Sequence, residues 1–175
     1  MTDLMVDLET LGTKPGCVIV SIGAVRFDRD GDGWSTDTAH EFHARVSIED
    51  CLRCGLSASG STIEWWMQRA AKWSPPTDAL PLSVALLCFS KFIGLGAPSR
   101  IWAHGATFDP PILVSAYDSV SLPVPWSYRQ VRDTRTLFDE AGLDYRTEAH
   151  HALDDARAQA RAVQAARRKL QGRAA

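Results

Sequence analysis

The first 46 residues carry the apolar and polar pattern of short strands joined by turns. Residues 4–8 are mostly apolar, and glycine and proline between 12 and 16 indicate a turn after them. The run 17–27 is rich in Val and Ile, and residues 38–46 alternate again after an Asp-Gly-Asp-Gly turn at 30–33. These three segments predict an antiparallel meander.

The pattern changes to a helical period in the middle of the chain. Ser61 and Glu64 have the spacing of a capping box and predict the start of a helix with an apolar stripe. The stripe consists of Ile63, Trp66, Met67 and Ala70, and Pro75 and Pro76 end the helix. Further on, the sequence predicts a helix over about 78–92, a strand over 100–103, and helices over 110–117 and 134–141, with Gly142 ending the last. The segment 124–131 fits no single pattern.

The last helix has the clearest pattern. Its apolar stripe consists of Leu153, Ala156, Ala160, Val163 and Leu170, whereas Arg157, Arg161, Gln164 and Arg168 lie off it. Such an amphipathic helix packs on a sheet. Together with the meander and the alternating elements before it, this helix predicts one mixed α/β (α+β) domain that spans residues 1–175.

Composition agrees with a globular domain and narrows the function classes. Hydrophobic residues at 45% and charged residues at 23% argue against a disordered or fibrous chain. The net charge of −2 argues against binding nucleic acid by overall basicity, so only a local site could do so. The longest apolar stretch, 79–89, is too short for a membrane span, and Asp3 stands where a signal peptide carries Lys or Arg. We therefore expect a cytoplasmic protein whose four cysteines, Cys17, Cys51, Cys54 and Cys88, are free thiols.

Three acidic segments are the candidates for chemistry. Asp7 and Glu9 are two residues apart on a predicted strand, so their side chains leave the same face. Asp109 follows the short strand near residue 100, and residues 150–155 combine two histidines with two aspartates at a helix start. Each segment alone is explained by a solvated strand end or a helix N-terminus, where carboxylates are common.

The combination of these segments matches the requirements of two-metal phosphodiester hydrolysis. Mg²⁺ and Mn²⁺ prefer oxygen ligands. Two such ions about 3.5–4 Å apart bridge a phosphate, lower the pKa of an attacking water and stabilise the leaving oxygen. A histidine beside them would be the general base.

The same residues resemble the three motifs of the DEDDh 3′-5′ exonucleases. These are residues 7–10 (DLET), 104–109 (HGATFD) and 150–155 (HHALDD), in this order. Residues 62–66 (TIEWW) and 132–137 (RDTRTL) are similar to segments of the phage exonuclease and exonuclease VIII-like group, which includes small bacterial exoribonucleases. The resemblance covers nearly the whole chain.

The resemblance implies a ribonuclease H-like fold, with a central five-stranded mixed sheet flanked by helices. It implies that two Mg²⁺ or Mn²⁺ ions are bound by four carboxylates, those of Asp7, Glu9, Asp109 and Asp155. The implied activity releases nucleoside 5′-monophosphates from the 3′ end of single-stranded DNA or RNA. The sugar stays open because the group contains both kinds of enzyme, and related enzymes often form homodimers. His104 stands where the second motif often carries Asn, which leaves its contact open.

Two histidines compete for the role of general base. In a continuous helix, His151 and Asp155 are four residues apart and share a face. The family motif places the base five residues before the last aspartate, at His150, which requires His150 to lie in a turn ahead of the helix. We favour His150.

Candidate substrate contacts come from three residues of the motif segments. Thr10 and Phe108 belong to the first and second motifs, and Trp65 lies one position off the apolar stripe of its predicted helix. Aromatic rings stack on the bases of single strands. A partly buried structural ring is the alternative for Trp65.

Other functions compete with this one. His40, His43, Cys51 and Cys54 could form a zinc site, but His40 and His43 would face opposite sides of a strand. A redox role for Cys51 and Cys54 would need a thioredoxin-like setting. Two further alternatives are a proofreading or adaptor subunit that docks to a polymerase and a non-catalytic nucleic-acid-binding module.

Overall fold

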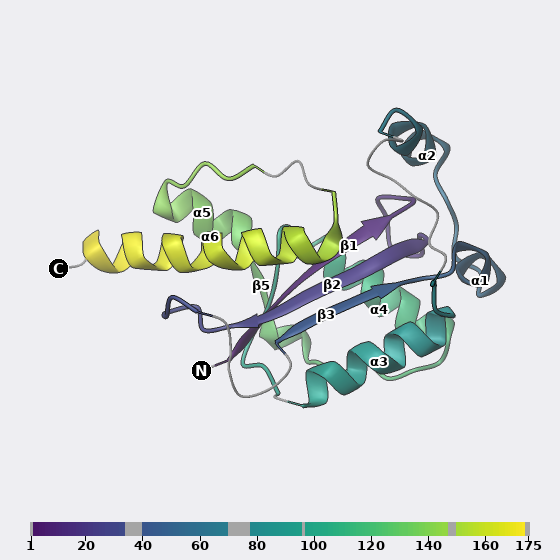
Figure 1. The fold of residues 1–175 in the computed structure, drawn as a ribbon, viewed down its shortest axis with the longest axis horizontal. Coiled ribbons are helices and arrows are strands. Elements are labelled where there is room, and N and C mark those ends of the chain that lie inside the picture. Colours follow the sequence, from purple (N-terminus) through teal and green to yellow (C-terminus); the bar gives the residue numbers. More distant parts are fainter. Residues whose placement is uncertain (1, 34–39, 70–77, 96, 147–149, 174–175) are drawn as a thin grey trace.

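A mixed five-stranded sheet forms the centre of the structure (Figure 1). The structure is a computed structural model, and it describes residues 2–33, 40–69, 78–95, 97–146 and 150–173. Its strand order is β3-β2-β1-β4-β5, with β1 at Asp3–Thr10, β2 at Ile19–Phe27, β3 at Glu41–Arg45, β4 at Ile101–Ala103 and β5 at Val131–Asp133. The pairs β1–β2 and β2–β3 are antiparallel, which confirms the meander, and β1–β4 and β4–β5 are parallel. The segment without a clear pattern contains a short 3₁₀ helix, η2 at Tyr128–Gln130, and the start of β5.

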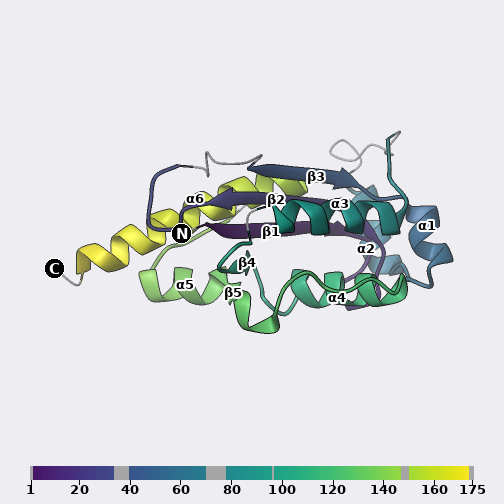
Figure 2. The same ribbon diagram turned by 90° about the horizontal axis from the view of Figure 1, so that it is seen from below.

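Helices cover both faces of this sheet. The described helices are α1 at Ile48–Arg53, α2 at Gly60–Met67, α3 at Leu82–Gly94, α4 at Asp109–Ser119, α5 at Thr134–Ala141 and α6 at Ala152–Arg173. α5 and α6 pack on one face, and α3 and α4 on the other (Figures 1 and 2). α1 and α2 lie at the end of the sheet where β1 terminates, and the C-terminal half of α6 extends past the opposite end. The end of β1, α2 and the start of α6 therefore surround one corner of the molecule.

The two faces of β1 differ in composition. Leu4, Val6 and Leu8 belong to the larger core, which α3 and α4 cover. Met5 belongs to the second core, which α5 and α6 cover. Because side chains alternate along a strand, Asp3, Asp7 and Glu9 share the face of Met5. The carboxylates of the first motif therefore lie on the α6 side of the sheet.

α6 approaches the sheet most closely at Gly23 of β2. Gly23 pairs with Asp7 on β1. A Cβ atom added at this position would lie 2.2 Å from the carbonyl carbon of Ala152 and 2.3 Å from the backbone nitrogen of Leu153. The lack of a side chain at Gly23 thus lets the first turn of α6 rest on β2, which brings Asp155 beside Asp7.

The prediction for α2 is wrong in two respects. The helix begins at Gly60 with Ser59 as its N-cap and no capping side-chain bond, so the proposed capping box does not form. The Ser61 hydroxyl instead lies 2.9 Å from the Ser59 hydroxyl. Of the described stripe only Trp66 is buried, whereas Ile63 and Met67 are 39% and 71% exposed because α2 lies beyond the end of the sheet. Ala70, Pro75 and Pro76 lie outside the described residues.

The later helices agree better with the sequence. α3 begins four residues after the predicted start because Pro81 is its N-cap, and a proline keeps the residue before it out of the helical conformation. α5 has the predicted bounds, and Gly142 ends it in the left-handed conformation at φ 59°. The stripe of α6 is buried at Ala156, Ala160 and Val163. Gln164, placed off that stripe, is buried as well, because its amide donates to the Asp28 and Gly33 carbonyls at 2.8 and 3.1 Å.

Candidate active site

A pocket of about 630 Å³ opens at the corner between the end of β1, α2 and the start of α6. Its wall contains each of the site residues proposed from the sequence, which are Asp7, Glu9, Thr10, Trp65, Phe108, Asp109, His150 and Asp155. These residues come from β1, from α2, from the β4–α4 connection with the first residue of α4, and from the first turn of α6 with the segment ahead of it. The fold thus brings together three motifs, of which the first and the third are about a hundred and fifty residues apart along the chain.

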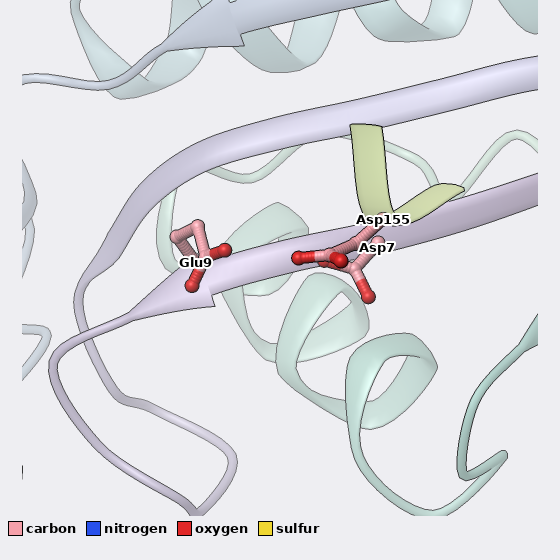
Figure 3. A group of neighbouring side chains, drawn as sticks. All are labelled: Asp7, Glu9 and Asp155. Carbon is pink, nitrogen blue, oxygen red and sulfur yellow. The ribbon is translucent and has the colours of Figure 1, made fainter. Parts of the chain in front are cut away.

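Three of the carboxylates converge on one point. Oxygen atoms of Asp7, Glu9 and Asp155 all lie within 4.8 Å of one another (Figure 3). Among the described His, Cys, Asp and Glu residues, this is the group close enough to hold one metal ion. Asp109 lines the same pocket, is 3% exposed and accepts a hydrogen bond from the Leu8 backbone at 3.1 Å. An all-oxygen set of four acids fits Mg²⁺ or Mn²⁺.

The carboxylates disfavour one another's charge. Burial raises the pKa of Glu9 to about 8, with Asp155 and Asp109 adding to the rise. Burial also raises the pKa of Asp109 to about 7. For Asp7, burial and then the charges of Asp109 and Glu9 raise the pKa well above its usual range. Divalent cations would relieve this repulsion, so the electrostatics of the pocket also fit a metal site.

Gln159 is a site residue that the sequence did not single out. It lies one turn after Asp155 on α6, is 1% exposed, and donates from Nε2 to Asp7 Oδ1 at 2.7 Å. This bond opposes the rise in the pKa of Asp7. The only signal in the sequence is the spacing of four residues from Asp155, which places both side chains on one helix face.

His150 lies ahead of α6, as the motif spacing required. Its φ of 51° is in the left-handed region, which costs a non-glycine residue about 1–2 kcal/mol. This conformation directs the ring into the pocket, where its centroid lies 4.8 Å from that of Trp65 in an edge-on contact.

His151 points to a different place. Its ring packs on that of His43 from β3, with centroids 4.7 Å apart, and its Nδ1 lies 3.1 Å from Asp154. The His151 backbone N–H donates to Asp155 Oδ2 at 3.1 Å. His151 therefore helps to orient Asp155 through its backbone, while the imidazole in the pocket is that of His150.

The loop that carries the second motif is tied to the start of α5. His104 Nδ1 lies 2.8 Å from the Thr134 hydroxyl, which gives the contact that the sequence left open. Asp133 accepts from the Ala106 backbone at 2.7 Å and from the Arg135 backbone at 2.8 Å. Burial and then the charge of Arg135 lower the pKa of His104. Arg135 itself lines the pocket, a second residue that the sequence did not single out.

The proposed substrate contacts lie at different depths. Thr10 is buried, and its hydroxyl donates to the Gly12 carbonyl at 2.7 Å. Trp65 and Phe108 are half-buried in the pocket wall. The Arg69 guanidinium covers the Trp65 ring at 4.0 Å from its centroid. The two aromatic rings are thus partly accessible from the pocket, whereas the Thr10 side chain is occupied by an internal bond.

The competing cysteine and histidine sites do not assemble. The four cysteines are free, as expected, and the buried Cys51 thiol lies 3.6 Å from the Ile19 carbonyl. In the part of the chain that the structure describes, the His40, His43, Cys51 and Cys54 set does not form a metal-ligand cluster. Within the same part, no helix has the length and apolarity to cross a membrane.

Comparisons with known proteins identify a family for this chain and solved structures with a similar fold. The profile of a family described as the 3′-5′ exoribonuclease Rv2179c-like domain matches residues 2–167. No curated protein matches the sequence. Cell-death related nuclease 4 (CRN-4) is similar in structure with a TM-score of 0.62 and 17% identity over 94% of this chain, which spans 62% of CRN-4.

Two further solved structures share the fold. The nuclease domain of 3′hExo, described as a DEDDh family member bound to rAMP, has a TM-score of 0.55 and 15% identity over 98% of this chain and 92% of its own. S. pombe Pop2p, in a Mg²⁺- and Mn²⁺-bound form, has a TM-score of 0.55 and 13% identity over 93% of this chain and 82% of its own. These likenesses confirm the expected ribonuclease H-like fold. The finer resemblance to the phage exonuclease group stays a prediction.

Proposed function

The chain belongs to the Rv2179c-like 3′-5′ exoribonuclease domain family, and from this premise we propose that it is a metal-dependent 3′-5′ exonuclease acting on single-stranded RNA. The observation that carries the proposal is the convergence of Asp7, Glu9 and Asp155 oxygens within 4.8 Å, in the pocket that Asp109 and His150 also line. The family description supports RNA over DNA as the substrate.

The residues of the pocket would have three different roles, which are metal binding, proton transfer and contact with the terminal base. Asp7, Glu9, Asp109 and Asp155 would hold two Mg²⁺ or Mn²⁺ ions, which when bound polarise the scissile phosphate and lower the pKa of the attacking water. His150 would accept the proton of that water, because its ring reaches the pocket from the turn ahead of α6. Trp65 and Phe108 would pack against the terminal base.

Four end-labelled oligonucleotides test this function. Matched single-stranded RNA and DNA oligomers, each labelled at the 5′ or the 3′ end, are incubated with Mg²⁺, with Mn²⁺ and with EDTA. We expect a metal-dependent ladder that shortens from the 3′ end, immediate release of a labelled mononucleotide from the 3′-labelled strand, and faster cleavage of RNA. Binding without cleavage in both metals would contradict the proposal and favour the adaptor or binding-module alternatives.

The assignment of the general base has its own test. His150→Ala and His151→Ala remove adjacent imidazoles that point to the pocket and to His43. Loss of a general base lowers turnover by about 10²–10⁴-fold. We expect that loss for His150→Ala and much less for His151→Ala in single-turnover assays with Mg²⁺. The reverse order would move the role of base to His151.

A further inference from the structure

Arg135 is the one Lys or Arg among the described residues of the pocket wall. It is the second residue of α5, and its side chain is exposed. Among the described residues its guanidinium has no hydrogen bond and no ion pair within 4.0 Å. A cation that lines an acidic pocket without joining its carboxylates is suited to bind a further anion.

The position of Arg135 is fixed by the loop of the second motif. The Asp133 carboxylate accepts from the Arg135 backbone and from the Ala106 backbone, so the start of α5 and this loop form one unit. Gly105 has a φ of +113°, and a Cβ atom added there would lie 3.3 Å from Cζ and Nη1 of Arg135. The guanidinium therefore lies directly against the backbone of the loop that leads to Asp109.

The charge of Arg135 acts on the site at a distance. It opposes the burial that raises the pKa of Asp109, although the two groups are not paired within 4.0 Å. Arg135 is thus beside the carboxylates and outside their cluster. A nucleic-acid strand whose last phosphate lies on the carboxylates must leave the pocket along its wall, where Arg135 lies. Each further linkage of that strand carries another phosphate.

We propose that Arg135 binds the phosphate of the linkage next to the scissile one, on its 5′ side. This inference rests on the proposed function. A guanidinium is suited to the task because it is always charged and offers paired N–H donors that match two phosphate oxygens. Arg135 would then set a minimum substrate length, since a dinucleotide without a terminal phosphate has no second phosphate for it to bind.

A pair of trinucleotides isolates this contact. Both carry deoxyribose at the first nucleotide, and one has a neutral methylphosphonate in place of the phosphate at the first linkage. With wild-type protein in Mg²⁺, we expect the methylphosphonate to lower kcat/KM by about 10-fold to 100-fold, mainly through KM. Arg135→Ala should cause the same loss on the phosphate substrate and no further loss on the methylphosphonate substrate.

Controls separate this role from support of Asp109. If Arg135→Ala lowers kcat equally on both trinucleotides, Arg135 acts through the carboxylates and the proposal is wrong. Arg135→Lys keeps the positive charge but lacks the paired N–H donors of the guanidinium, so it should recover part of the loss on the phosphate substrate. Arg168→Ala removes the same charge from the far part of α6, where Arg168 pairs with Asp32, and should leave both substrates unaffected.

A binding assay gives a result independent of turnover. The affinity for a fluorescent single-stranded oligonucleotide is measured in Ca²⁺ over a range of salt concentrations. Loss of one phosphate contact should lower the slope of log affinity against log salt by about 0.7 for Arg135→Ala. An unchanged slope would overturn the proposal. Failure of the wild-type protein to cleave any oligonucleotide in Mg²⁺ would instead overturn the proposed function.

Discussion

The two ends of one face of β1 carry carboxylates in opposite surroundings. Asp3 is fully buried, accepts a hydrogen bond from Trp102 Nε1 at 2.9 Å, and lies 3.9 and 3.7 Å from the guanidinium groups of Arg29 and Arg100. Two positions beyond Met5, Asp7 has an amide donor in Gln159 but acidic groups around it. The same side chain on the same strand therefore has cationic neighbours at one end and anionic neighbours at the other.

The sign of the neighbouring charges separates the two roles, because desolvation raises the pKa of both carboxyl groups. Burial raises the pKa of Asp3, while Trp102 and the two arginines oppose the rise. At Asp7 the nearby carboxylates add to the effect of burial. An anion that the fold itself neutralises is a structural element. A cluster of anions that the fold leaves uncompensated favours a proton or a cation from outside, which supports our proposal that this end of β1 is the functional one.

The largest expected difference between the two ends is in turnover. Asp7→Asn or Asp155→Asn removes the negative charge of a proposed metal ligand and should lower turnover by about 10³-fold or more, while circular dichroism shows an intact fold. Asp3→Asn, the same change at the other end of the strand, should stay within a few-fold of wild type. Comparable activity of the Asp7 and Asp3 variants would remove the distinction between the ends.

A smaller effect is expected at the amide that holds Asp7. Groups that orient a metal ligand typically contribute 10-fold to 100-fold to metal affinity or activity. Gln159→Leu should raise the Mg²⁺ concentration for half-maximal activity by that factor. Gln164→Leu is the matched control, because this buried amide bonds to the Asp28 and Gly33 carbonyls and should leave the Mg²⁺ requirement unchanged. Equal shifts in both variants would mean that Gln159 acts only through the packing of α6.

The elements with strong local signals could be predicted from the sequence. Apolar runs bounded by turn residues predicted β1 and β2, and Gly142 marked the end of α5 because its left-handed conformation favours glycine. The four carboxylates and His150 were proposed because they match, in type and in order, the motifs of the DEDDh exonucleases, and the fold brings all five to one pocket. α2 was misjudged because an apolar stripe indicates burial only when a core lies beneath it, and Ile63 is exposed beyond the end of the sheet.

Other features depend on contacts between distant segments. Gly23 appears in the sequence as one small residue in an apolar strand, and its meaning follows from the α6 backbone that rests on it. Gln159 and Arg135 look like ordinary polar positions of helices. Their roles follow from Asp7 and Gly105, which are 152 and 30 residues away along the chain. No local pattern encodes such separations.

Thermal stability should change in opposite directions at the two ends. Asp3→Ala leaves the buried Trp102 N–H without its acceptor, which costs about 1–3 kcal/mol and lowers Tm by roughly 2–10 °C. Asp7→Asn removes the repulsion but keeps an Oδ1 acceptor for the Gln159 amide, so it should leave Tm in EDTA at pH 8 equal or higher. Differential scanning calorimetry gives both values. A clear fall in Tm for Asp7→Asn would show that the charge of this acid stabilises the fold.

The pH dependence of stability gives the smallest expected effect. The pKa of Glu9 rises from 4.5 to about 8 and that of Asp109 from 3.8 to about 7 in the folded protein. Between the unfolded-state and folded-state pKa values of these two acids, the folded state binds more protons than the unfolded state. The metal-free protein should therefore lose stability as pH rises from about 4 to 8. We expect a fall in Tm of a few degrees in EDTA over this window.

Magnesium should reverse that trend. Metal binding requires deprotonated carboxylates, so stabilisation by Mg²⁺ should grow as pH rises through the same window. Asp3→Ala should retain this gain, because its partners Trp102, Arg29 and Arg100 lie outside the pocket. Asp155→Asn should lose most of it, because the variant lacks one of the three converging carboxylates. Identical pH profiles in EDTA and in Mg²⁺ for the wild-type protein would mean that the carboxylates at the end of β1 repel one another without holding an ion.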